Sequence, residues 1–357
     1  MGKEGKKCNY SAKNGIFMLY SPLYLFKLMK QESISMKKFE NQITTTMNMG
    51  LKSMLSMLKD AVIGKENRKP AVPIQVEEFK ADEMISHAAA PRITWFGHSA
   101  FYLEIEGKKL LFDPMFSLRP SPLPWVGTKR YTGSLLRKLD DFPMLDAVII
   151  SHDHYDHLDY PSIVRLKDKT ARFIVPLGVR KRLIKWGISA EKITEHSWWE
   201  ELQYHNLMLA CTPSRHFSGR GLHDRNATLW CSWVIKGPEW RIFYSGDSGY
   251  GPHFKEIGEK YGPFHLTIME CGQYDERWAA IHMKPEETVQ AHLDLQGETL
   301  LPVHWAGFTL AYHEWTDPVE RAIAAALKNE VKIITPKIGE TVAVTAENVP
   351  TQPWWRI

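Results

Sequence analysis

Three histidines and two aspartates lie within six residues of one another, and these residue types at this spacing can bind metal ions. They belong to the sequence His-Asp-His-Tyr-Asp-His at residues 152–157, which follows Ser151 and the apolar run Ala-Val-Ile-Ile at residues 147–150. In an extended segment His152 and His154 point the same way, and the turn after them can bring Asp156 and His157 to the same place. Burial of these groups without a partner would be costly, so packing does not explain the cluster. We therefore predict a metal site here.

Three later residues can complete the ligand set, because each stands shortly after a predicted strand: His216, Asp247 and His304. Glycines before and after Asp247 let the backbone approach a metal pair closely, which makes this residue our candidate for a bridging carboxylate. By itself, Gly-Asp-Ser-Gly is more typical of a simple turn. Neutral imidazoles together with carboxylates suit Zn²⁺, with Fe or Mn as alternatives.

The elements around these residues follow from the spacing of apolar positions. Strands are predicted at residues 93–96, 101–105, 109–112, 147–151, 207–212, 229–235, 241–245, 266–270, 299–303, 332–335 and 341–344. Helices are predicted at residues 159–166, 179–186, 285–294 and 318–328. Two successive β-rich halves, each with helices, indicate two sheets packed face to face with helices outside.

The N-terminal quarter differs from the rest in charge and composition. Residues 1–69 hold 13 Lys and Arg against 5 Asp and Glu, whereas the remainder holds 32 against 36. Residues 36–58 are rich in methionine and weakly amphipathic, and residues 64–91 have the polar, proline-containing composition of a linker. We predict an N-terminal extension and linker at residues 1–91 and a catalytic domain at residues 92–357.

The same N-terminal extension bears on the compartment. Its apolar stretch at residues 16–29 is shorter than the roughly 20 residues of a spanning helix and is interrupted by Pro22 and Lys27. The four cysteines form no CxxC pair, which fits a reducing compartment. The basic charge fits either a solvated leader or contact with an anionic membrane surface. We expect a cytoplasmic protein that can bind a membrane peripherally.

In their order along the chain, the motifs HxHxDH, His, Asp and His resemble those of the metallo-β-lactamase superfamily. The resemblance implies an α/β (α+β) fold, the four-layer αβ/βα sandwich. It also implies two metal ions, expected to be Zn²⁺. One would be held by His152, His154, His216 and Asp247, and the other by Asp156, His157, Asp247 and His304.

Further segments resemble the family of N-acyl-phosphatidylethanolamine-hydrolysing phospholipases D. They lie at residues 116–131, 151–160, 198–200, 246–250 and 274–278. In that family a histidine before a Pro-Glu-Glu helix lies at the active site, and His282 occupies the matching place. The family residue just before it is glutamine, whereas this chain has Ile281.

The resemblance implies hydrolysis of N-acyl-phosphatidylethanolamine to N-acylethanolamine and phosphatidic acid. A water between two divalent ions has a lowered pKa, so a metal-bridging hydroxide would attack the phosphorus in line. We predict Asp156, Asp247 and His282 as catalytic residues. His282 would orient the phosphate or protonate the leaving oxygen, unless it only lines the pocket. The expected partners are a phospholipid substrate, a membrane surface and a second copy of the chain in a homodimer.

Alternative functions stay open at this point. Another hydrolase of the superfamily, such as a lactonase or a nucleic-acid phosphodiesterase, would use the same metal ligands. Residues 70–357 are net acidic, which weakens capture of a polyanion, so no nucleic-acid partner is expected. A catalytically silent scaffold or lipid-binding protein is disfavoured because every expected ligand position is filled.

Overall fold

The computed structural model of the chain describes residues 38–48, 50–63, 66–79, 90–345 and 351–357. The apolar stretch at residues 16–29 and the first part of the basic segment lie outside the described residues. Within the described ranges, no helix is both long and apolar enough to cross a bilayer.

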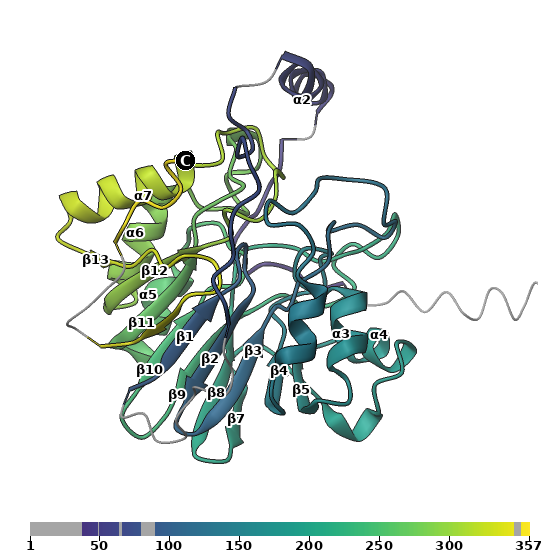
Figure 1. Cartoon of the computed structure of the whole chain (residues 1–357), viewed down its shortest axis with the longest axis vertical. Coiled ribbons are helices and arrows are strands. Elements are labelled where there is room, and N and C mark those ends of the chain that lie inside the picture. Colours follow the sequence, from purple (N-terminus) through teal and green to yellow (C-terminus); the bar gives the residue numbers. More distant parts are fainter. Residues whose placement is uncertain (1–37, 49, 64–65, 80–89, 346–350) are drawn as a thin grey trace, which may run out of the picture. The chain divides into compact units, whose positions relative to one another are not determined.

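Seven strands form the first sheet, in the order β14-β1-β2-β3-β4-β5-β6 (Figure 1). Their bounds are β1 Arg92–Trp95, β2 Phe101–Ile105, β3 Lys108–Phe112, β4 Leu145–Ile149, β5 Thr170–Pro176, β6 Ile193–His196 and β14 Thr341–Ala343. β14, β1, β2 and β3 pair antiparallel, and β3 to β6 pair parallel. β1 and β3 therefore run in the same direction as β4.

Seven more strands form the second sheet, in the order β13-β12-β11-β10-β9-β8-β7. Their bounds are β7 Glu201–Tyr204, β8 Leu207–Thr212, β9 Ser232–Lys236, β10 Arg241–Tyr244, β11 Phe264–Glu270, β12 Gly297–Val303 and β13 Lys332–Ile333. β7 to β10 pair antiparallel, and β10 to β13 pair parallel. β8, β10, β11 and β12 consequently share one direction, and their carboxyl ends lie at one edge.

Helices cover the outer face of each sheet, which completes four layers (Figure 1). The α-helices are α2 Leu51–Ile63, α3 Tyr160–Leu166, α4 Arg180–Lys185, α5 His253–Tyr261, α6 Pro285–Asp294 and α7 Asp317–Lys328. The short 3-10 helices are η2 Leu136–Asp141, η3 Ala190–Lys192 and η4 Glu276–Trp278. One hydrophobic core lies between the sheets, a second lies beneath α3 and α4, and a third lies beneath α5, α6 and α7. The predicted αβ/βα sandwich is confirmed.

Local sequence explains why α3 and α6 begin where they do. The carboxylate of Asp159 accepts a hydrogen bond from the Ser162 amide at the start of α3. Pro285 is the first residue of α6, where a missing N–H costs nothing, and Glu287 caps the Lys284 amide. These signals are local, and the predicted bounds of α6 agree with the structure.

Several elements were missed or displaced in the sequence prediction. β5, β6, β7 and α5 were not predicted, and the strand predicted at residues 229–235 spans 232–236 instead. Residues 229–231, just before this strand, are apolar and buried but do not belong to it. Because they continue the apolar run, the prediction placed the start of the strand too early. β7 alternates exposed and half-buried positions at a sheet edge, which leaves little hydrophobic signal.

Candidate metal centre

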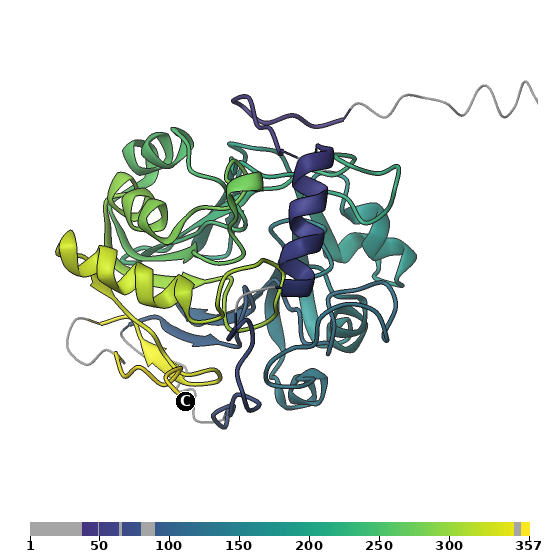
Figure 2. The ribbon, with the colours of Figure 1, turned by 90° about the horizontal axis from the view of Figure 1, so that it is seen from above.

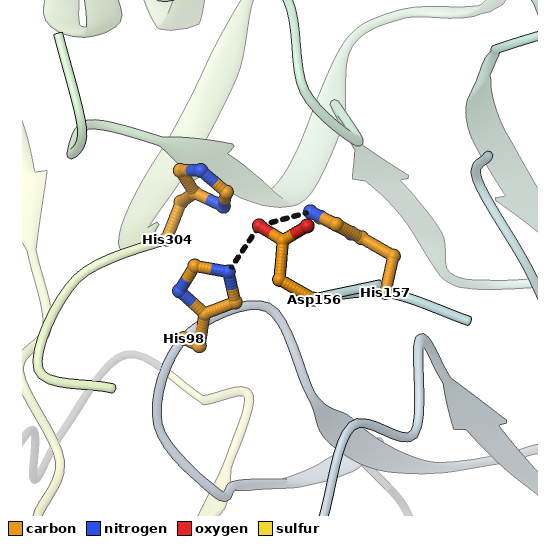
Figure 3. Close-up of side chains that lie close together, drawn as sticks. All are labelled: His98, Asp156, His157 and His304. Atoms are coloured by element: carbon orange, nitrogen blue, oxygen red, sulfur yellow. Dashed lines mark hydrogen bonds and ion pairs between the residues drawn. The ribbon is translucent and has the colours of Figure 1, made fainter. Parts of the chain in front are cut away.

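All seven predicted metal ligands lie together at the edge where the strands of one direction end. β4 delivers the 152–157 motif, and the loops after β8, β10 and β12 deliver His216, Asp247 and His304. The turn after β4 places the Asp156 and His157 side chains toward each other (Figure 3). The convergence follows from topology, because loops after parallel strands meet at one edge of a sheet.

Four of the ligands form a first group around a common point. Nε2 of His152 lies 2.9 Å from Nδ1 of His154, which in turn lies 3.2 Å from Nε2 of His216. Oδ2 of Asp247 lies 3.7 Å from Nε2 of His152 and 3.8 Å from Nε2 of His216. An ion bound at the usual ~2.0–2.1 Å holds tetrahedral ligand atoms about 3.3 Å apart. The three imidazole nitrogens are therefore close enough to share one ion, and Oδ2 of Asp247 lies beside two of them.

A second group surrounds the other side of Asp247. Nε2 of His157 lies 3.1 Å from Oδ2 of Asp247 and 3.6 Å from Oδ2 of Asp156. The other oxygen of Asp247, Oδ1, lies 3.1 Å from Nδ1 of His304. Asp247 thus faces both groups, which is the position that a bridging carboxylate requires.

Unpaired polar atoms and charge both favour bound cations. Nε2 of His157 and Oδ1 of Asp247 are buried and make no hydrogen bond within the described chain. Burial lowers the pKa of His152 and His216 well below its usual value and that of His154 to about 4, so these imidazoles are neutral. Burial also raises the pKa of Asp247 to about 6. Neutral imidazoles are the form that metal ions bind. His157 differs, because the carboxylates of Asp247, Asp156 and Asp113 outweigh the effect of burial and raise its pKa well above the usual value.

Asp113 orients His157 and was missed in the sequence prediction. Its Oδ2 accepts a hydrogen bond of 2.7 Å from Nδ1 of His157 and another from the Tyr244 hydroxyl. Its Oδ1 accepts from the Ser151 amide at 2.8 Å. The carboxylate fixes the imidazole so that Nε2 is left for a metal. Its place directly after β3, beside the strand that carries the main motif, was the available signal.

His98 is a second residue that the sequence prediction missed. It is buried, its Nε2 lies 2.9 Å from Oδ2 of Asp156, and its ring packs 4.2 Å from that of His304 (Figure 3). Burial lowers its pKa to about 4, so the neutral ring donates its Nε2 proton to the carboxylate. The His98 amide also donates to the Trp305 carbonyl, which ties the loop after β1 to the loop after β12. His98 therefore positions Asp156, and its ring stands close enough to the second group to count among potential ligands.

His282 lies next to the centre and is held by a buried glutamate. Its Nδ1 lies 2.7 Å from Oε2 of Glu270, whose Oε1 accepts a hydrogen bond from the Met283 amide. Burial raises the pKa of Glu270 well above its ordinary value and lowers that of His282. With Nδ1 bound to Glu270, Nε2 of His282 is the nitrogen left for a ligand.

A cavity of about 170 Å³ opens onto these residues. Its polar wall is formed by His154, Asp156, His216, Asp247, Gln273, His282 and His304. Its remaining wall is mostly apolar and is formed by Met47, Phe217, Trp278, Ile281 and Leu310. A substrate in this cavity therefore contacts both the polar side chains of the centre and apolar side chains.

The sandwich and the cluster of His and Asp side chains define a metal-dependent hydrolase of the metallo-β-lactamase fold. The model of the beta-lactamase superfamily domain matches residues 108–305, more than half of the chain, and the chain belongs to this superfamily. Among its relatives is N-acyl-phosphatidylethanolamine-hydrolyzing phospholipase D 1 of Caenorhabditis elegans, 34% identical over 254 residues that cover 68% of this chain and 71% of the relative.

Two further relatives show how widely the architecture is shared. An uncharacterized protein of Mycobacterium tuberculosis is 44% identical over 295 residues, covering 81% of this chain and 77% of the relative. The solved structure of Igni18, a metallo hydrolase of the archaeon Ignicoccus hospitalis, superposes with a TM-score of 0.56 at 24% identity, over 72% of this chain and 100% of that one. The latter likeness supports the fold alone.

Proposed function

We propose that the chain is a phosphodiesterase of the phospholipase D type, which hydrolyses N-acyl-phosphatidylethanolamine to N-acylethanolamine and phosphatidic acid. The observation that carries the proposal is the cavity, where ligands for two ions meet an apolar wall of five side chains. Such a wall suits the acyl chains of a lipid whose phosphodiester must reach the metal centre. The Caenorhabditis elegans relative, by its name, acts on the same lipid.

The ligand set is proposed to hold two Zn²⁺ ions, one in each group around Asp247. When bound, two such ions supply Lewis acidity that neutralises phosphoryl oxygens and lowers the pKa of a water molecule. The carboxylate of Asp247 is placed to hold both, and Asp113 and His98 keep His157 and Asp156 in their orientations. The chain thus provides a preorganised, buried site for a phosphodiester.

His282 is placed to manage the proton of the leaving group. Water oxygen forms a bond to phosphorus while the bond from phosphorus to the ethanolamine oxygen breaks, and that oxygen must gain a proton. Glu270 holds His282 by Nδ1 and leaves Nε2 facing the cavity that His282 lines. The raised pKa of Glu270 keeps a proton on its carboxyl group, which then donates to Nδ1, so the neutral ring carries its own hydrogen on Nε2. Nε2 can therefore deliver that proton to the leaving oxygen, with the proton released by the attacking water replacing it, or orient the phosphate.

Mass spectrometry of lipid products tests this proposal. The full chain, loaded with zinc, is incubated with micelles of N-acyl-phosphatidylethanolamine, beside chelator-treated protein and chelator-treated protein to which zinc is returned. We expect N-acylethanolamine and phosphatidic acid in equal amounts from the zinc-loaded and restored samples only. Zinc-loaded protein that forms neither product would refute the lipid assignment, and lactones and other phosphodiesters would then be assayed.

A further inference from the structure

We propose that α2 is a membrane-binding helix that seats the opening of the metal centre on an anionic phospholipid surface. The proposal deepens the proposed function, because it assigns the surface from which a lipid substrate would enter. It starts from the unusual orientation of this helix.

The side of α2 that faces the body of the protein carries mostly polar residues, together with half-buried Met57. Arg277 lies in η4, and its guanidinium donates to the Asp60 carboxylate at 2.8 Å and to the Ser56 hydroxyl at 3.3 Å. The Arg277 carbonyl accepts from the Asn48 amide at 2.7 Å, just before the helix. Ser53, on the same side of α2, is buried. Polar contacts thus fix the helix, whereas surface helices usually pack through an apolar stripe.

The apolar stripe of α2 faces outward instead. Leu51, Met54, Leu55 and Leu58 are all more than half exposed, with 59% exposure at Leu55 and 66% at Leu58. Their spacing of three and four residues places them on one face of the helix. A 13-residue helix gains little stability by itself, and this one does not use its apolar face for packing. That face therefore has the composition of a binding surface.

Charge on the helix indicates which partner fits. Lys52 and Lys59 are exposed and seven residues apart, so both border the apolar stripe on the same side. The one carboxylate of α2, Asp60, is engaged by Arg277 on the opposite side. If two copies of the chain paired through this stripe, four lysines would meet at the interface, and α2 would offer no carboxylate there to neutralise them. Anionic lipid headgroups would meet the lysines directly while the leucines enter the acyl region.

The helix also lies next to the metal centre. Met47, four residues before α2, and Trp278, next to Arg277, both line the cavity. In Figure 1 α2 lies at the top, and in Figure 2 it runs across the loops at that edge, nearest the viewer. A lipid surface that binds α2 would therefore lie close to the cavity opening.

Sedimentation with vesicles tests the surface without using activity. The zinc-loaded full chain is mixed with vesicles of phosphatidylcholine alone or with about one third phosphatidylglycerol, neither containing N-acyl lipid. We expect binding to the anionic vesicles, weakened about tenfold by Leu58→Glu and about fivefold for each lysine removed in K52Q/K59Q. The matched control is Leu327→Glu on α7, a helical leucine that is exposed at 74% against 66% for Leu58 and should bind like the wild type.

The outcomes separate this inference from the proposed function. Absence of vesicle binding by the wild type, or wild-type binding by Leu58→Glu, would overturn the role of α2 whatever the substrate is. If Leu58→Glu binds vesicles like the wild type but no longer forms a dimer in sedimentation velocity, the apolar stripe binds a second copy of the chain instead. If Leu58→Glu loses vesicle binding but cleaves a soluble phosphodiester at the wild-type rate, the helix acts in docking, even if no N-acyl lipid is hydrolysed.

Discussion

Replacement of Asp113 by asparagine should weaken metal binding although Asp113 touches no metal. Its carboxylate accepts hydrogen bonds from Nδ1 of His157, from the hydroxyls of Ser151 and Tyr244, and from the Ser151 amide. An asparagine must turn its NH2 group either toward the His157 proton or toward the Ser151 amide. In either orientation, the NH2 group faces another buried hydrogen-bond donor, which is left without an acceptor. The substitution also removes the negative charge behind the His157 ring.

Two magnitudes follow for Asp113→Asn. A buried donor without an acceptor costs about 1–3 kcal/mol of unfolding free energy. Loss of a carboxylate behind a metal-binding histidine typically lowers metal affinity 10–100-fold, which corresponds to about 1.4–2.7 kcal/mol. We therefore expect weaker zinc binding in the folded variant and a lower thermal midpoint for the metal-free protein.

Competition with a chromophoric chelator measures the zinc affinity, and calorimetry measures the midpoint. The matched control is Asp146→Asn, the same chemical change at the other end of β4, where the carboxylate accepts from the Lys109 amide. That variant should bind zinc like the wild type. If Asp113→Asn also keeps wild-type zinc affinity, then Asp113 does not orient His157 for a metal. A lower thermal midpoint without a change in zinc affinity would mean that Asp113 contributes to folding only.

Three further perturbations test other parts of the centre. Removal of metal should abolish hydrolysis and lower the thermal midpoint, because an ion at 1,000 times its dissociation constant adds about 4 kcal/mol of stability; return of zinc should restore both. Gly272→Ala would place a Cβ 2.2 Å from the His304 carbonyl oxygen, so metal content by mass spectrometry should fall, whereas Gly221→Ala, with its nearest atom at 3.6 Å, should keep it. Glu270→Gln should lower kcat about 10–100-fold, most on substrates with poor leaving groups, because His282 loses its carboxyl partner; equal rates on good and poor leaving groups would contradict a proton-transfer role.

The sequence indicated the candidate ligands because the 152–157 motif is local and each later candidate follows a predicted strand. A histidine-rich motif after an apolar strand indicates metal binding before any tertiary contact is known, and His216, Asp247 and His304 each follow a strand in the chain itself. The order of these motifs indicated the superfamily, and with it the two-sheet sandwich. Assignment of the ligands to two ions, and of the extension and domain at residues 1–91 and 92–357, stays a prediction.

Other parts of the centre depend on contacts between residues distant in the chain. Asp113 meets His157 across 44 positions, and His98 meets Asp156 across 58. Each is one polar residue after a strand, a pattern that also occurs in ordinary turns, so neither stood out before the strands were ordered in the sheet. The register of neighbouring strands decides which strand-end residues meet.

The orientation of α2 shows the same limit most clearly. The sequence indicated a weakly amphipathic segment, and an apolar stripe on a helix normally predicts the side that packs against the core. Here the ion pair between Asp60 and Arg277, 217 residues apart, turns the polar side inward and leaves the stripe exposed. Periodicity determines which residues share a face of a helix, but only the tertiary structure decides which face is buried, because the partner that selects it lies elsewhere in the chain.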